Sequence, residues 1–497
     1  MSTHHTPRTT LILCSLTILT YIGMASVDWR FGTLRDQFVV QTIGWYLVAF
    51  AVFVVLIVWA ERCDIDMRFV WGTAIVVRLV LLTTTPTLSD DVYRYLWDGH
   101  VAVNGVSPYA LPIDSAELNY LDTPIRSLAN NTWMASPYMP AAQFIFRTTA
   151  WLLPLTPLVL QIAMIVFDLG SAFILSKLLA IGNYAPHRLT LYLLNPLIIV
   201  EVAHSAHIDA WMIFLLLLAL YKSIEPQRVQ GAQRQEREEE KGIATEYRIP
   251  ITDYLLLITA HWSLPPLLLA LATLTKIIPI LALPIFFWRW SWKQLFLYGG
   301  LTLGLLLPAG LRAGWGLSAD LSGTGLFGAL RIYAAQWNFN SGIFHWLQDE
   351  LTRRAVADPL NRAKLIALLG TLIVLGIVWL LARNASTRTL LRLMIVPFAA
   401  YLLLTPTVHP WYALIVMTFV PFLAPAVGEK NWLPTLPFLY LSAALIFSYI
   451  TYRDPPDFRE YEWVRQTEWI PTLLLLTTVL LHYAWQQKES LRLRMIE

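Results

Sequence analysis

The stretch from Thr87 to Tyr109, T-L-S-D-D-V-Y-R-Y-L-W-D-G-H-V-A-V-N-G-V-S-P-Y, decides the fold and the site expected for this chain. It follows an apolar run, Phe69–Thr85, that is long enough to cross a bilayer at about 1.5 Å per residue. The carboxylates of the stretch are therefore expected at a membrane–water boundary, where ionisable groups are costly unless they have a function.

Helical spacing places Asp91, Arg94 and Asp98 on one face of this stretch. The pattern predicts a helix lying in the interface, with its charged face toward water and its apolar side in lipid or protein. Two other interpretations stay open. Asp98 could form a salt bridge with Arg94 four residues earlier, and Ser89 or Asp90 could cap the helix.

The composition favours a polytopic membrane protein. Hydrophobic residues make up 57% of the 497 residues and charged residues only 14%, against about 25% charged in soluble domains. The 21 Trp and 21 Tyr are typical of interfacial aromatic belts. Cys14 and Cys63 imply neither a disulfide scaffold nor a thiolate metal site. The sequence has no basic stripe with interleaved aromatics, so we expect no nucleic-acid partner.

The apolar runs predict an all-α bundle of about 12–14 transmembrane helices, with interfacial helices in long extracytoplasmic loops. The predicted spans are 11–27, 39–60, 69–87, 155–177, 188–203, 208–222, 295–311, 363–382, 391–406, 411–425, 433–450 and 468–485. Residues 251–288 form another apolar stretch, interrupted by Pro265-Pro266 and by Lys276. This stretch predicts a hairpin of two short helices with Lys276 near the turn. A re-entrant hairpin and two full spans both fit.

The distribution of Lys and Arg predicts the orientation. With the N-terminus in the cytoplasm, the short inside segments are denser in Lys and Arg than the longer outside segments, as the positive-inside rule requires. Loops 88–154 and 312–362 then face away from the cytoplasm. Long loops of this kind are usually functional when ordered, so we expect the working surface there.

Adjacent carboxylates point in different directions, so Asp90 and Asp91 are expected to have different roles, one of them as a general base. Arg78, in the middle of a span, and Lys276 are candidate cations for an anionic leaving group. For Arg78, an internal ion pair with Glu201 or Asp168 is the alternative interpretation.

Later motifs add further polar candidates. The run E-V-A-H-S-A-H-I-D holds His204, His207 and Asp209, and these residues favour hydrogen bonding to a sugar or phosphate. A divalent metal is possible there, but no clear ligand set supports one. In T-V-H-P-W-Y, His409 could donate to a phosphate or serve with its neighbours as an interfacial anchor. Asn340 could bind sugar hydroxyls or cap a turn.

Five motifs, taken in order, resemble blocks of the GT-C superfamily of integral-membrane glycosyltransferases. They are S-D-D-V-Y-R-Y-L-W-D-G-(x8)-P-Y, L-N-P-L-I-I-V-E-V-A-H-S-A-H-I-D-A, L-T-K-I-I-P-I-L-A-L-P, W-N-F-N-S-G-I-F and T-V-H-P-W-Y. Within the superfamily the chain is similar to polyprenyl-phosphate-mannose-dependent mannosyltransferases, the group with glycosyltransferase family 87 and the mycobacterial α-1,6-mannosyltransferase relatives. The resemblance covers most of the chain from about Arg78 onward.

The resemblance implies a sugar donor on polyprenyl phosphate, with mannose by family analogy, and a glycolipid, glycan or protein acceptor. It implies an integral protein of the prokaryotic cytoplasmic membrane, surrounded by membrane lipids and active on the extracytoplasmic face. It divides the chain into two N-terminal transmembrane helices (1–68), a GT-C-like catalytic membrane module (69–485) and a cytoplasmic tail (486–497). No cofactor is firmly implied.

The outer-loop aspartate of the family falls on Asp91, which the resemblance makes the catalytic base. Asp90 is a departure, because many relatives have another residue there, and the usual P-x-Y-P-P-L block is here Ser136–Ala141. The substrate-binding residues implied are Asp90, Arg94, Asp98, Tyr138, His207, Asp209, Lys276, Asn340, His409, Trp411 and Tyr412.

The expected chemistry fits these residue types. An acceptor hydroxyl must lose its proton as it attacks the anomeric carbon, and a carboxylate with an ordinary pKa near ~4 is ionised and can accept it. The leaving phosphate gains charge and needs cations or hydrogen-bond donors, for which Lys276, His409 and Arg94 are candidates. A single direct displacement implies inversion at the anomeric carbon.

The competing interpretation is a transporter or lipid flippase for a lipid-linked or anionic substrate. It would explain charges at mid-membrane and the interrupted 251–288 segment. However, the hydrophobic pattern shows no internal repeat, and the acidic cluster lies at the interface rather than the midplane. A polysaccharide polymerase or ligase is a third class with charged outer loops.

Overall fold

The computed structural model describes residues 6–32, 35–239, 251–317, 323–453 and 459–494. This part of the chain consists of helices and connecting segments, and its only strand-like pairing is the isolated bridging of Phe339 and Asn340 with Thr407. The predicted all-α class is confirmed.

Three N-terminal helices form the first layer: α1 (Thr6–Phe31), α2 (Arg35–Arg62) and α3 (Met67–Leu81). Helix α1 packs against both α2 and α3. The Asp66 carboxylate accepts the Arg68 backbone N–H at 2.9 Å and caps α3. Helix α3 ends at Leu81 rather than at the predicted residue 87. The prediction was wrong there because Pro86 cannot continue a helix and because Thr87 bonds to His204 instead.

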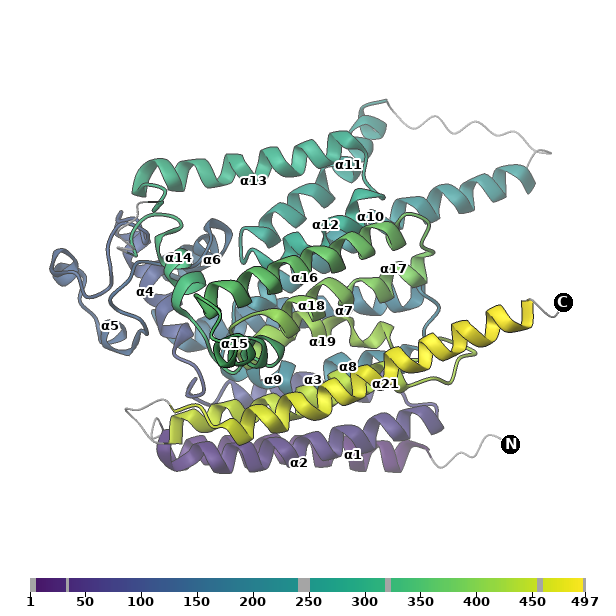
Figure 1. Ribbon diagram of the computed structural model, residues 1–497, viewed down its shortest axis with the longest axis horizontal. Coiled ribbons are helices and arrows are strands. Elements are labelled where there is room, and N and C mark those ends of the chain that lie inside the picture. Colours follow the sequence, from purple (N-terminus) through teal and green to yellow (C-terminus); the bar gives the residue numbers. More distant parts are fainter. Residues whose placement is uncertain (1–5, 33–34, 240–250, 318–322, 454–458, 495–497) are drawn as a thin grey trace.

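The segment after α3 holds short helices at one end of the molecule: α4 (Asp91–Val103), η1 (Ala116–Leu121), α5 (Pro124–Leu128) and α6 (Pro140–Leu152). Helix α4 packs against α6 and α5. Figure 1 shows α4, α5 and α6 at the left end of the bundle, while the N and C labels both lie at the right end. The 88–154 loop is therefore at the opposite end from both termini.

The next segment contains a sharp break that positions the site. Its elements are α7 (Pro157–Ile181), η2 (Pro186–Leu189), α8 (Thr190–Leu193), α9 (Pro196–Ile199), the π-helical turn η3 (Val200–His204) and α10 (Asp209–Glu239). The chain bends by 118° between 196–204 and 209–224. The predicted span 188–203 is thus several short helices, because Pro196 interrupts it and the Asn195 side chain caps the next piece through the Leu197 N–H.

The break leaves backbone carbonyls without helical partners, and α7 supplies a donor for them. The Gln161 side-chain amide donates to the carbonyls of Ala203 and His204, at 3.0 Å each. Ala206 then adopts a positive φ of 57°, which is rare for a residue with a β-carbon. This backbone conformation turns the chain into α10.

The 251–288 region is a helix followed by a break at Lys276. Its elements are α11 (Ile251–Thr273), η4 (Ile278–Ala282) and α12 (Leu283–Phe287). The expected interruption at Pro265-Pro266 is wrong, because both prolines lie inside α11; neighbouring helices allow transmembrane helices to tolerate proline. The expected position of Lys276 between two helices is confirmed.

The remaining helices complete the bundle: α13 (Trp292–Ala313), α14 (Gly328–Gln336), α15 (Ile343–Arg353), α16 (Pro359–Ala382), α17 (Thr387–Leu393), α18 (Ile395–Leu404), η5 (Pro410–Ala413), α19 (Leu414–Phe419), η6 (Val420–Phe422), η7 (Leu433–Thr435), α20 (Leu436–Ala444), η8 (Leu445–Arg453) and α21 (Glu462–Arg494). Helix α21 packs along α20, and η8 packs on α2. The predicted span 411–425 is a chain of three short helices, since Pro410 and Pro421 begin new turns.

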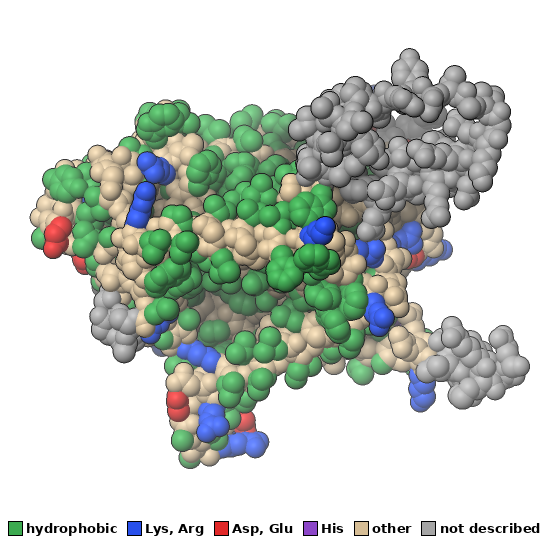
Figure 2. All heavy atoms as spheres, turned by 90° about the horizontal axis from the view of Figure 1, so that it is seen from above, with side chains coloured by type: hydrophobic (Ala, Val, Ile, Leu, Met, Phe, Trp, Pro, Cys, Tyr) green, Lys and Arg blue, Asp and Glu red, His purple; other side chains and the backbone are tan. Residues whose placement is uncertain are grey.

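Within the described residues, seven helices are long and apolar enough to span a bilayer, or eight if the bent pair counts as one span. The protein is therefore a polytopic membrane protein. The predicted 12–14 spans are not reached by this measure, because several of them are short or broken helices. Hydrophobic side chains cover much of the face in Figure 2. Helix α13 contributes four strongly exposed ones, Trp292, Phe296, Leu303 and Leu311.

Candidate active site

Asp91 is the first residue of α4 and lies at the edge of the site. The Ser89 hydroxyl accepts its backbone N–H at 3.3 Å. Its carboxylate is 14% exposed, with Oδ1 accepting from the Asn130 amide at 2.7 Å. The Tyr95 hydroxyl lies 3.5 Å from Oδ2. The carboxylate is thus oriented by a neighbouring loop yet still reachable from outside.

Asp90 occupies the N-cap position of α4 but makes no side-chain capping bond. Its carbonyl accepts the N–H groups of Tyr93 and Arg94, and its side chain is half-buried. Asp90 therefore occupies the predicted cap position, but its carboxylate accepts no capping hydrogen bond.

Arg94 and Asp98 are buried residues of α4, so the prediction that the charged face of this helix points to water is wrong. Their side chains are 1% and 2% exposed, and Arg94 Nε lies 3.2 Å from Asp98 Oδ1. This pair confirms the alternative interpretation of a salt bridge between residues four apart. Asp98 also accepts from Ser136 and from the Gln143 amide. Burial raises the pKa of Asp98, while Arg94 and these donors act against the rise.

The Arg94 guanidinium also fixes the loop that orients Asp91. It donates to the carbonyls of Asn130, Asn131 and Met134 at 3.0–3.2 Å. Because the Asn130 side chain is the donor to Asp91, Arg94 holds that donor in place through the backbone of the same residue. Arg94 is therefore a positioning residue in this structure, and its side chain is buried.

His207 lies on the other side of Asp91, in the turn between η3 and α10. Its Nδ1 is 3.9 Å from Asp91 Oδ2, and its Nε2 is 3.1 Å from Glu201 Oε2. His207 and Glu201 are fully buried. The Tyr449 hydroxyl donates to Glu201, lying 2.9 and 3.0 Å from its two oxygens.

Lys276 and Asp209 form the charged pair of the site. Lys276 Nζ is 2.5 Å from Asp209 Oδ2, with the side chains 15% and 3% exposed. Lys276 also lies over the Tyr412 ring, 5.8 Å from its centroid. The ammonium thus has a protein carboxylate as its partner in this structure, in addition to any contact it makes with a substrate.

An aromatic stack connects three distant segments at this site. The rings of Phe339 and His409 stack at 4.7 Å, those of His409 and Trp411 at 4.4 Å, and those of Trp411 and His207 at 4.2 Å. The Tyr412 hydroxyl bonds to that of Tyr333. Burial, with a smaller effect of Lys276, lowers the pKa of His409. His409 is therefore a neutral hydrogen-bonding group rather than a cation.

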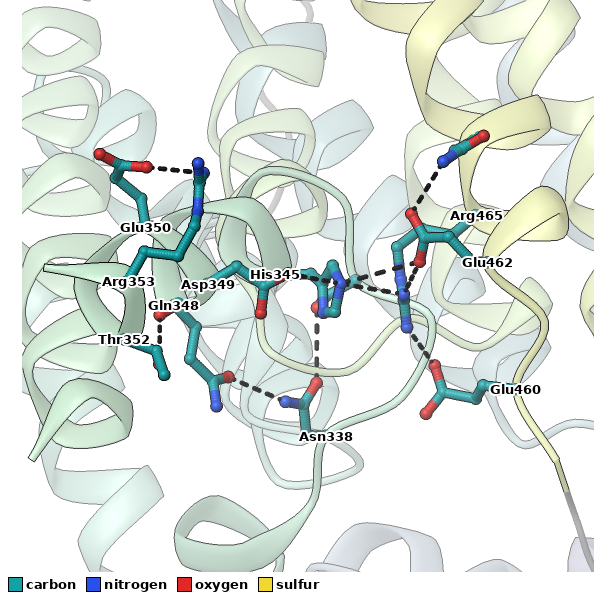
Figure 3. A network of polar contacts seen from close by, with 12 residues as sticks. Asn338, His345, Gln348, Asp349, Glu350, Thr352, Arg353, Glu460, Glu462 and Arg465 are labelled. Atoms are coloured by element: carbon teal, nitrogen blue, oxygen red, sulfur yellow. Dashed lines mark hydrogen bonds and ion pairs between the residues drawn. The ribbon is translucent and has the colours of Figure 1, made fainter. Parts of the chain in front are cut away.

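Asn340 belongs to a neighbouring polar cluster rather than to the Asp91 group. Its side-chain amide donates to Glu468 at 2.6 Å, and its backbone N–H donates to Glu460 at 2.9 Å. Figure 3 shows how Arg465 joins Glu460 to Glu462 and His345, so that this network ties the loop around Asn338 to α21. Phe339 is the link between this cluster and the aromatic stack.

Two other candidates have structural partners. Arg78 pairs with Asp168 at 2.6 Å, and both side chains are fully buried, which confirms the internal ion-pair alternative. His204 bonds to Thr84 and Thr87 and so fixes the segment that follows α3. Among the residues that the structure describes, no group of three or more His, Cys, Asp or Glu could hold a metal ion.

The structure thus brings most of the predicted candidates into one cluster. Its members are Asp91, His207, Asp209, Lys276, His409, Trp411 and Tyr412. Tyr138 borders it, because its ring packs edge-on against Tyr95 at 4.9 Å.

Sequence reasoning missed three members. Asn130, Glu201 and Tyr449 contact the cluster from distant segments. Only Glu201 had a signal, as an acidic residue inside an apolar run and inside the second motif block, but the one role it was given was that of a candidate partner of Arg78. Asn130 and Tyr449 carry no local signal, because their roles depend on contacts made only in the folded bundle.

The comparison with protein-family models identifies the family of this chain. Residues 16–292 match the family model described as alpha-(1->6)-mannopyranosyltransferase, N-terminal domain. The match covers more than half of the chain and includes Asp91, Glu201, His207, Asp209 and Lys276. A search of curated proteins finds no match.

Proposed function

The chain belongs to the α-(1→6)-mannopyranosyltransferase family, and on that premise we propose that it transfers mannose from a polyprenyl-phosphate donor to an acceptor hydroxyl. The transfer takes place on the extracytoplasmic face, with Asp91 as the general base. The single observation that carries this proposal is that a partly exposed Asp91 carboxylate lies within electrostatic reach of the Lys276–Asp209 pair.

Asp91 suits the role of base. One oxygen is held by Asn130, so the other is left toward the site with Tyr95 and His207 at longer distances. An ionised carboxylate fixed in this way can accept the proton of an attacking hydroxyl as the bond to the anomeric carbon forms. Displacement in one step inverts that carbon.

In this proposal the leaving phosphate binds at Lys276 and His409. Lys276 supplies positive charge, and His409, kept neutral, supplies a hydrogen-bond donor. A membrane-embedded enzyme suits a donor whose polyprenyl chain stays in the bilayer. The exposed apolar surface of α13 offers such a chain a compatible neighbour.

The decisive test of function is transfer of labelled mannose from mannosyl-phosphoryl-polyprenol to an alkyl mannoside by the purified protein. Product formation separates an enzyme from the transporter alternative, which would move substrate between vesicle compartments without forming a new glycosidic bond. Vesicle uptake without product would refute the enzymatic proposal.

We expect the site face to be extracytoplasmic. A cysteine at Tyr120, which is 70% exposed in the 88–154 loop, should label with an impermeant thiol reagent in intact cells after Cys14 and Cys63 are replaced. A cysteine at Asn384, in the exposed connection between α16 and α17, should label only after the membrane is opened. The opposite pattern would put Asp91 on the cytoplasmic side and remove the case for a donor presented outside.

We expect Lys276→Met to weaken donor binding. The single change also leaves the Asp209 carboxylate buried without its cation, so part of any effect is lost stability. The double variant Lys276→Met/Asp209→Asn removes both charges and serves as the matched control. If Lys276 holds phosphate, the double variant regains thermal stability but shows a smaller donor-induced rise in melting temperature than the wild type. Wild-type donor affinity in the double variant would eliminate the phosphate role.

A further inference from the structure

Glu201 and His207 form a buried carboxylate–imidazole pair that the proposed function does not use. Glu201 lies in the π-helical turn and His207 in the turn that follows, and neither side chain is exposed. The imidazole stands between two carboxylates, with Nε2 3.1 Å from Glu201 and Nδ1 3.9 Å from Asp91. The three groups thus run from the fully buried Glu201, through His207, to the partly exposed Asp91.

The two ring nitrogens of His207 are buried but lack an aligned hydrogen-bond partner among the described residues. Buried polar atoms are nearly always bonded, so such an exception calls for a functional explanation. The ring itself is fixed, because it stacks on Trp411 at 4.2 Å and an interplanar angle of 21°. Its nitrogens are therefore held in place close to both carboxylates.

The Glu201 side chain is also fixed by a neighbour. The Tyr449 hydroxyl lies 2.9 and 3.0 Å from its oxygens, and the carboxylate is fully buried. A buried carboxylate is strongly disfavoured unless a cation or donor compensates it. The imidazole of His207 is the nearest group that can gain positive charge.

The charged and titratable groups around the pair come from six segments of the chain. They are Asp91 of α4, His204 of η3, Asp209 of α10, Lys276 after α11, His409 before η5, and Tyr449 of η8. Lys276 is neutralised by Asp209 at 2.5 Å. Asp91 and Glu201 therefore remain as the carboxylates that a protonated His207 would balance.

We propose that His207 takes over the proton that Asp91 receives from the acceptor hydroxyl, and that Glu201 positions His207 for this step. This inference rests on the proposed function of Asp91. In its protonated form the imidazole would lie between two carboxylates, 3.1 Å from Glu201 and 3.9 Å from Asp91, which stabilise its positive charge. The transfer therefore returns Asp91 to its ionised form.

The step balances as follows in atoms and charge. The acceptor O–H bond breaks, its oxygen bonds to the anomeric carbon, and the bond from that carbon to the phosphate oxygen breaks with its electron pair left on the phosphate. The proton goes to Asp91 Oδ2 and then, after a side-chain rotation shortens the 3.9 Å separation, to His207 Nδ1. The imidazolium lies between two carboxylates until product departure lets the proton return to solvent through Asp91.

The test uses the purified full-length protein, with mannosyl-phosphoryl-polyprenol as donor and an alkyl mannoside as acceptor. In His207→Ala we expect kcat to fall by at least about 10-fold, short of the ~10²–10⁴-fold effect of losing a general base. The donor KM should change little. Added imidazole should restore part of the lost kcat, because it can occupy the space left by the ring and accept the proton.

Glu201→Gln keeps the size of the side chain and its bond with Tyr449 but removes the negative charge. We expect kcat to fall and the acidic limb of the kcat–pH profile to move to lower pH, because the imidazolium loses its counter-charge and the pKa of His207 falls. The double variant Glu201→Gln/His207→Ala should be no less active than His207→Ala, since Glu201 acts through the imidazole. If Glu201→Gln does not fold, imidazole rescue of His207→Ala decides the question alone.

His204 is the matched control, because it lies three residues away, is also buried, and bonds to Thr84 and Thr87 rather than to Asp91. Any loss in His204→Ala should not be restored by imidazole, and its pH profile should keep the wild-type shape. Loss in His207→Ala without rescue and with an unchanged profile would show a structural role and overturn the inference. Wild-type kcat and pH profile in both His207→Ala and Glu201→Gln, with Asp91→Asn inactive, would overturn it while leaving the role of Asp91 intact. Full activity of Asp91→Asn would overturn both.

Discussion

Asp91→Asn should abolish mannosyl transfer while leaving the protein folded. The amide oxygen of asparagine can still accept from Asn130, so the start of α4 and the 130–134 loop should keep their positions. What disappears is the proton acceptor, and loss of a general base costs about 10²–10⁴-fold in rate. We expect kcat to fall by at least about 10²-fold, with donor binding retained.

The matched control for this variant is Asp122→Asn. Asp122 belongs to the same 88–154 segment, but its side chain is 68% exposed and pairs with Arg126 at 3.8 Å. Its substitution should leave transfer unchanged. Near-normal transfer by Asp91→Asn, measured under saturating donor, would remove Asp91 as the base and direct attention to Asp90, the next carboxylate along the chain.

The largest effect on stability is expected at Arg78. The Arg78–Asp168 pair is fully buried, and Asp168 accepts another hydrogen bond from the Tyr192 hydroxyl at 2.7 Å. Arg78→Met removes the cation and leaves that carboxylate in the interior. Breaking a buried pair from one side costs about 3–5 kcal/mol. We therefore expect a large fall in melting temperature of the purified protein in detergent.

Removing both charges should be much less harmful. In Arg78→Met/Asp168→Leu neither charge of this pair is left in the interior, so most of the lost stability should return. Arg68→Met provides the control for charge removal alone, because Arg68 is 90% exposed beside Asp66, and its loss should change the melting temperature little. A single Arg78→Met variant as stable as the wild type would show that the pair does not hold α3 to α7.

Helix α4 shows where sequence analysis succeeds and where it fails. The carboxylate cluster after an apolar run predicted α4, and the motif blocks predicted most of the residues that meet at the site. The same helical pattern misplaced Arg94 and Asp98, because it assigns charges to water. In the structure they neutralise each other and bind backbone carbonyls, Ser136 and Gln143.

Contacts across the chain explain what could not be predicted. Glu201 and Tyr449 are 248 residues apart, and Asn130 reaches Asp91 from 39 residues away. No local pattern encodes such pairs. The broken spans had a visible cause in Pro196 and Pro410, but the bend of 118° depends on how the pieces pack, which hydropathy does not report.

The bend at η3 has a consequence for the order of assembly. In hydrocarbon, a carbonyl freed from a helix costs several kcal/mol unless a donor reaches it. The donor for Ala203 and His204 is Gln161, which comes from α7 and not from the bent segment itself. An isolated 186–224 segment should therefore stay straighter in the membrane, and the turn that presents His207 to Asp91 should form only when α7 docks. The geometry of the site then forms late in folding, when helices that have inserted into the bilayer separately pack against one another.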